Sequence, residues 1–243
     1  MLTHPLFPDH PLVEPMDLTS GRLPAHLADA EPVLRATLDW ARRYLCQPHP
    51  ELGRKGNVCP FVETALHRNT FFMAVYRGRP DPTHMRDLLT LYRTWFADLE
   101  PRTGRSAQFK TILVLFPDVP DTELQHVIDG TQRALKTDYV AGGLMIGEFH
   151  AGPPDKPGLW NDRFRPLASP IPLLAIRHMV PSDFPFLRSD REHLRSYLER
   201  FGGDLPGYLQ DTVTATAARH GLLVPAPAEP DHPGEPAQPA EAR

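Results

Sequence analysis

Cysteine is scarce in this sequence. Only two of the 243 residues are cysteines, Cys46 and Cys59, and they form no CxxC or CxxCH motif. A disulfide framework, a cysteine zinc site and covalent haem attachment are therefore not expected. The first 17 residues carry prolines and acids where a secretory signal would need a basic start and an apolar run. The cytoplasm is the expected location.

An excess of positive charge is also missing. Lysine and arginine number 26 against 30 aspartates and glutamates, which gives a net charge of −4. No general attraction to phosphate backbones or anionic lipids is expected from such a balance. The longest apolar stretches are strand-sized, well short of the roughly 20 residues that cross a bilayer. We expect neither nucleic acid nor membrane as a partner. The sequence does not indicate the oligomeric state.

Several catalytic signatures do not occur. The chain contains no GxSxG, P-loop, GxGxxG or HExxH motif. Each of these motifs supplies a defined element of chemistry, respectively a nucleophile elbow, a phosphate cradle, a dinucleotide turn and a zinc-binding helix. Hydrolase, nucleotide-kinase and Rossmann functions therefore lose their usual support.

Proline is abundant, at 29 residues, and unevenly distributed. It is frequent in residues 1–31, and Pro225 to Arg243 holds six prolines and no aromatic residue. Such a segment buries too little apolar surface to offset its chain entropy. We predict a proline-rich N-terminal arm over 1–31, one folded domain over 32–222 and a disordered proline-rich tail over 223–243.

Hydrophobic periodicity predicts the elements of the domain. Apolar positions at helical spacing indicate helices over 32–47, 81–99, 121–139, 191–201 and 205–220. Runs rich in β-branched and aromatic residues indicate strands over 70–76, 110–116, 144–150 and 172–180. The order lacks the strict alternation of a doubly wound fold. It predicts a single α+β domain with a four-stranded mixed or antiparallel sheet packed by helices.

The first polar segment is the loop 49–61, HPELGRKGNVCPF. Its glycines and the basic pair Arg54 and Lys55 could present backbone N–H groups and cations to an anion. Cys59 lies in the same loop as a candidate nucleophile, although a cysteine among apolar neighbours more often serves packing.

The second and third polar segments accompany the last two strands. Residues 142–150, GGLMIGEFH, place Glu148 and His150 on one face, because side chains alternate along a strand. Arg163 follows in the segment from residue 160. In the final strand the same alternation places Arg177 and His178 on opposite faces. We expect these polar sets to converge on one pocket.

These three segments resemble an uncharacterised actinobacterial family of unknown function over residues 32–220, through HPELGRKGNVCPF, GGLMIGEFH and PLLAIRHMVPSDFPFL. More distantly, the order of the segments resembles the YqcI/YcgG family, some members of which are haem enzymes that oxidise nitrogen in small-molecule biosynthesis. Carried over by position, that resemblance points to His150, Arg163, Phe164 and His178.

Three functions follow as hypotheses. The first is a haem b oxidoreductase, oxygenase-like, acting on a small nitrogen-containing metabolite of specialised metabolism and served by a redox partner protein. His150 or His178 would be the iron ligand, with Cys59 as a third option. The haem propionates would meet three arginines, Arg54, Arg163 and Arg177.

The second hypothesis is a non-catalytic domain that binds an anionic small molecule. The third gives Cys59 the role of nucleophile in acyl or amide transfer or hydrolysis, with His150 or His178 as its base. Glu148 is a further catalytic candidate in either enzyme.

Overall fold

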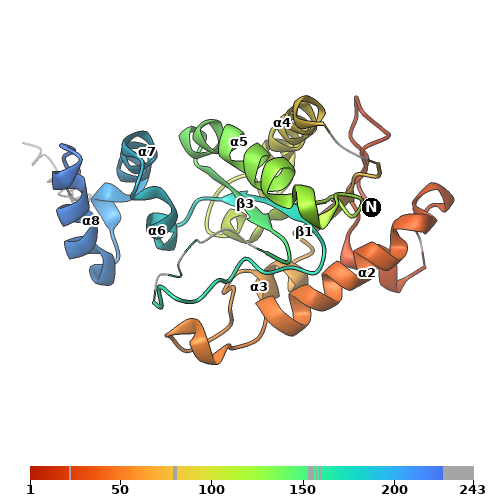
Figure 1. Ribbon diagram of the computed structural model, residues 1–243, viewed down its shortest axis with the longest axis horizontal. Helices are drawn as coiled ribbons and strands as arrows, with labels where there is room; N and C mark the ends of the chain where they lie inside the picture. Colours follow the sequence, from red (N-terminus) through yellow and green to blue (C-terminus); the bar gives the residue numbers. More distant parts are fainter. Residues whose placement is uncertain (22, 79–80, 153–155, 157, 159, 227–243) are drawn as a thin grey trace, which may run out of the picture.

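The computed structural model describes residues 1–21, 23–78, 81–152, 156, 158 and 160–226 (Figure 1). The chain folds into a central sheet with helices on both faces. The predicted α+β class is confirmed.

The sheet has four strands: β1 (Phe71–Val75), β2 (Thr111–Leu115), β3 (Leu144–Phe149) and β4 (Leu173–His178). Their order is β1-β2-β4-β3. β1 and β2 are parallel, whereas β4 runs antiparallel to both of its neighbours. The sheet is therefore mixed, and β3 is an edge strand of it.

Helices α4 (Pro82–Asp98) and α5 (Gly130–Ala141) cover one face of the sheet. The Asp81 side chain caps α4 by accepting hydrogen bonds from the N–H groups of Thr83 and His84, at 2.9 and 3.1 Å. The predicted helix 121–139 is not one regular helix, because a 3₁₀ turn and a π-helical turn at Gln125–Asp129 precede α5.

Helices α2 (Glu31–Trp40) and α3 (Val62–His67) lie on the other face, as Figure 1 shows. A π-helical turn at Ala41–Leu45 extends α2 to nearly the predicted end. These helices pack over β1 and β2, through Phe71, Met73 and Leu113 among others. The same core reaches Leu173 of β4, and Trp40 at the end of α2 packs against Phe149 of β3, with ring centroids 5.7 Å apart.

The N-terminal arm contributes to the core. It contains the short helix α1 (Pro15–Thr19), and Val13 bridges to Met73 of β1. Leu12 and Val13 are buried on opposite faces of the sheet, since one joins the α4–α5 core and the other the α2–α3 core. The predicted arm is thus partly integrated into the fold.

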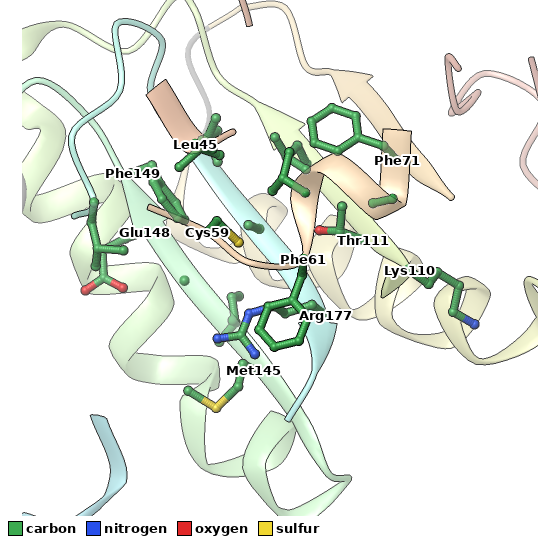
Figure 2. Close-up of a pocket in the computed structure, with 18 of the residues that line it drawn as sticks. Leu45, Cys59, Phe61, Phe71, Lys110, Thr111, Met145, Glu148, Phe149 and Arg177 are labelled. Atoms are coloured by element: carbon green, nitrogen blue, oxygen red, sulfur yellow. The ribbon is translucent and has the colours of Figure 1, made fainter. Parts of the chain in front are cut away.

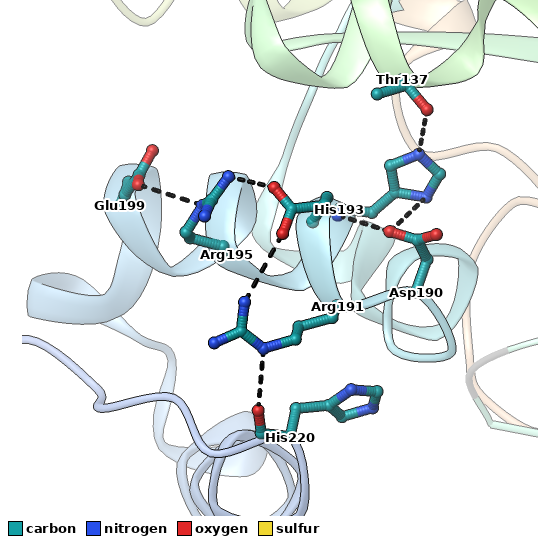
Figure 3. A network of polar contacts seen from close by, with 8 residues as sticks. Thr137, Asp190, Arg191, His193, Arg195, Glu199 and His220 are labelled. Carbon is teal, nitrogen blue, oxygen red and sulfur yellow. Dashed lines mark hydrogen bonds and ion pairs between the residues drawn. The ribbon is translucent and has the colours of Figure 1, made fainter.

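Three helices gather beyond the ends of β3 and β4: α6 (Phe184–Leu187), α7 (Arg191–Phe201) and α8 (Gly207–Arg219). Figure 3 shows how α7 is held. His193 Nε2 lies 3.0 Å from the Thr137 hydroxyl of α5, and Arg191 donates to the His220 carbonyl after α8. No helix in the described part of the chain combines the length and apolarity needed to cross a membrane. The predicted tail lies outside the described residues from 227 onward.

Candidate functional site

A pocket lies against β4 and the edge strand β3, beneath the loop that leads into α3 (Figure 2). The enclosed part of the pocket has about 120 Å³ of room for a water-sized sphere, and the pocket opens to solvent on one side. Its lining comes from α2, α3, α5 and the strands, so it forms only in the folded chain.

Small residues make room at its floor. Gly147 of β3 and Ala175 of β4 are register partners and both line the pocket. A Cβ atom on Gly147 would lie 3.3 Å from the Phe149 ring. The missing side chain therefore keeps space open beside Phe149.

The walls are mostly apolar. They include aromatic rings from the α3 loop, β1, the segment before β2 and β3, namely Phe61, Phe71, Phe109 and Phe149. Cys59 is a half-buried free thiol in the same wall. The neighbouring Cys46 is a weak acid, because burial raises its pKa to about 11. The surroundings suit the apolar body of an organic ligand.

Glu148 supplies the most unusual polar group of the pocket. Its side chain is 2 % exposed, and one carboxylate oxygen is paired with Lys156. The other oxygen, Oε2, is buried without a hydrogen-bond partner among the described residues. Lys136 also lines this end and donates to the Phe186 carbonyl at 2.6 Å. Burial lowers the pKa of Lys136, and the charge of Lys156 lowers it further.

Arg177 lies in the pocket nearer to Phe61 and Met145 (Figure 2). Two of its nitrogens bind the Asp183 carboxylate at 2.7 and 2.5 Å. Burial opposes the charge of Arg177, but Asp183 outweighs burial and the pKa of the guanidinium is raised. Arg177 is therefore largely neutralised by its own partner.

His150 does not line the pocket. Its ring is fully buried, and Nε2 lies 2.8 Å from Asp129 Oδ1 in the turn before α5. Its Nδ1 accepts a hydrogen bond from the Gly152 N–H at 3.2 Å. Both ring nitrogens are thus engaged within the protein.

His178 does not line the pocket either. It packs against the Phe96 ring of α4, with ring centroids 5.0 Å apart. Burial lowers its pKa to about 4, and the charges of Lys110 and Arg200 add to that effect. Its Nε2 is buried without a hydrogen-bond partner among the described residues.

The two remaining candidates also lie elsewhere. Arg54 folds back on its own loop and donates to the carbonyls of Lys55 and Val58, at 3.0 and 3.2 Å. Arg163 is exposed in the segment after residue 160. Of the expected site residues, Cys59, Glu148 and Arg177 line this pocket. The other four, Arg54, Arg163, His150 and His178, do not line it.

Sequence reasoning missed Lys136, Lys156 and Gly147. Lys136 looks like an ordinary helical lysine, and Lys156 lies in a loop without any motif. Gly147 did carry a signal, because an isolated glycine inside a strand often marks close approach of a ligand or backbone.

The described residues contain no group of three or more His, Cys, Asp or Glu side chains placed to hold a metal ion. Fold and pocket together define an α+β domain with a mostly apolar cavity that carries both signs of charge at one end. A family described as a domain of unknown function (DUF6875) matches residues 34–212, and the chain belongs to this family. No curated protein and no solved structure matches the chain significantly. The predicted membership of an uncharacterised family is confirmed, whereas the YqcI/YcgG resemblance gains no support.

Proposed function

We propose that this protein binds a small organic molecule in the pocket beside β3. The apolar body of the ligand would lie against the Phe61, Phe71 and Phe149 rings on the α2–α3 side of the sheet. Glu148 faces the α5 side of the same edge strand, so the polar end of the ligand would reach it around β3 at Gly147. The observation that carries the proposal is the buried Glu148 Oε2, which has no hydrogen-bond partner among the described residues. An unsatisfied buried polar atom costs about 1–3 kcal/mol, more when it is charged, and a ligand donor would remove that cost.

The geometry favours the binding of a small molecule over a reaction in which Cys59 is the nucleophile. A thiol nucleophile needs a base within hydrogen-bond reach. The two histidines expected to act as that base line no part of the pocket, and His150 is already bonded at both nitrogens. Cys59 is therefore best interpreted as part of the apolar wall.

The haem hypothesis stays a prediction. Of the three candidate iron ligands, only Cys59 lines the pocket. Arg177 is the propionate candidate that lies there, and Asp183 already occupies its guanidinium. The pocket supports an organic ligand without requiring haem, so binding of a small molecule is the simpler account.

The proposal is tested by filling the cavity. Ala175→Leu adds side-chain volume at the floor, and Ala134→Leu, on the exposed side of α5, is the matched control. A panel of small organic acids, amines and amino acids would be screened by thermal shift. A ligand at 100 times its Kd stabilises the folded state by about 2.7 kcal/mol. We expect such a shift in the wild type and in Ala134→Leu.

The same ligand should shift the Tm of Ala175→Leu much less. Equal stabilisation of all three proteins would place binding outside the pocket and contradict the proposal.

A further inference from the structure

The charged groups at the Glu148 end define what the ligand must carry. We infer that the ligand is a zwitterion with a primary ammonium and a carboxylate on an apolar body, the chemistry of an apolar α-amino acid. The ammonium binds Glu148, and the carboxylate binds Lys136 and Lys156. This inference rests on the proposed function and names its ligand class.

The ammonium half follows from Glu148. Its carboxylate is 2 % exposed, and Lys156 satisfies one oxygen only. No donor among the described residues meets the acceptor that is left, so a donor carried by a ligand can meet it. A charged donor is favoured, because hydrogen bonds between ionised groups are shorter and about twice as strong as neutral ones.

The carboxylate half follows from the two lysines. An ammonium group has three N–H donors. Lys136 donates to the Phe186 carbonyl, and Lys156 donates to Glu148. The remaining donors of both groups can converge on a ligand carboxylate at the same end of the pocket. Lys136 gains most from such a partner, because burial and the charge of Lys156 both disfavour its ammonium form.

The charges at this end favour a ligand with both groups over a simpler one. Among the groups that line the pocket there, the two lysines and Glu148 leave one net positive charge, and Asp190, which also acts on Lys136, lies outside the lining. A plain amine would satisfy Glu148 but place a third cation beside the lysines. A plain carboxylate would satisfy the lysines but leave Glu148 Oε2 unpaired. A ligand with both groups satisfies both requirements.

Arg177 is not part of the site formed by Glu148, Lys136 and Lys156. Its guanidinium is bound by Asp183 at two nitrogens and lies at the level of Met145 along β3. Met145 and Glu148 are three positions apart, which corresponds to about 10 Å along the strand, and their side chains face opposite sides of the sheet. The ligand body would pass around this edge strand at Gly147 to reach the Met145 region.

The experiment compares four ligands on the full-length protein by calorimetric titration. L-phenylalanine carries both groups, phenethylamine lacks the carboxylate, 3-phenylpropanoate lacks the amine and benzyl alcohol lacks both. We expect L-phenylalanine to bind at least about tenfold tighter than each of the others.

Two variants test the ammonium site at Glu148 and the carboxylate site at Lys136 separately. Glu148→Gln should abolish the preference for L-phenylalanine over 3-phenylpropanoate, and Lys136→Met should abolish its preference over phenethylamine. Asp138→Asn, on the exposed side of α5, is the control and should change neither ratio. Unchanged ratios in Glu148→Gln would overturn the assignment of the ammonium site.

Different outcomes contradict the zwitterionic ligand and the binding pocket. Binding of all four compounds with similar affinity, or strongest binding of the singly charged acid, overturns the zwitterion and leaves the pocket as a binding site. No binding by any of the four, including benzyl alcohol, counts against the pocket and the zwitterion together.

Discussion

Glu148 and His178 each keep a buried polar atom without a hydrogen-bond partner among the described residues, but their surroundings differ. Glu148 lines an open pocket with two lysines close by, whereas His178 is packed against an aromatic ring under α4. A polar atom without a partner beside a cavity can be met by a ligand, which is the basis of the proposed function. An orphaned atom inside a core indicates a cost to stability.

His178 makes the folded state sensitive to acid. Its pKa in the folded protein is about 4, against 6.5 as the ordinary value. The unfolded chain therefore binds the proton more readily, and stability falls as the pH drops from about 6.5 to about 4. Because the side chain is partly exposed, we discount the full shift and expect a loss of about 1–2 kcal/mol.

The check is urea unfolding at pH 7 and at pH 4 for the wild type and for His178→Leu. The variant should lose about 1–2 kcal/mol less than the wild type across this interval. His126→Leu, at an exposed position before α5, is the control and should behave like the wild type. An identical loss in all three proteins would show that His178 titrates normally.

Period-two alternation was the most reliable residue-scale signal. It predicted that Arg177 and His178 face opposite sides of the sheet, and this is confirmed by Arg177 in the pocket and His178 against Phe96. Alternation could not show which face is open, because that depends on where α2 and α3 stop covering the sheet. For that reason His150 and His178 looked equivalent to Arg177 as candidates.

At the scale of elements, hydrophobic patterning predicted all four strands to within two residues. It could not predict the π-helical turns at Ala41–Leu45 and Gln125–Asp129. The hydrogen bonds of a π turn span five residues where those of an α-helix span four, so a single π turn changes the apolar pattern very little. The turn before α5 nevertheless matters, because it carries the Asp129 that binds His150.

The end of α4 depends on a buried lysine. Lys110 is fully buried, and its ammonium donates to the carbonyls of Phe96 and Leu99 at 2.7 and 2.6 Å. It also lies 4.4 Å from the centroid of the Phe96 ring. Burial lowers its pKa to about 8. The group caps the helix where carbonyls have no partner within the helix.

Lys110→Met should therefore destabilise the protein by about 2–4 kcal/mol, since two buried carbonyls lose their donor. The exposed Lys55→Met is the control and should change stability by less than about 0.5 kcal/mol. The measurement is the midpoint of urea unfolding. Similar midpoints for the two variants would show that solvent replaces the lost donor.

At the scale of the whole molecule, the pocket is assembled from segments more than 100 residues apart in the chain, from Trp40 to Phe186. Fold class could be predicted because each element carries its own periodicity. The site could be predicted only in part, because Lys136 and Lys156 acquire their role from neighbours that the fold brings together. Cytoplasmic location and the lack of a nucleic-acid partner stay predictions.

The central claim is that the pocket beside β3 binds a small molecule, and the methyl resonance of Met145 tests it most directly. The chain has six methionines, of which Met145 lines the pocket and Met85 lies in the α4–α5 core. In a protein labelled with carbon-13 at the methionine methyl groups, Met145→Leu would assign the signal. We predict that L-phenylalanine shifts the Met145 signal saturably and leaves the Met85 signal in place. A Met145 signal that does not respond to any member of the ligand panel would contradict the account.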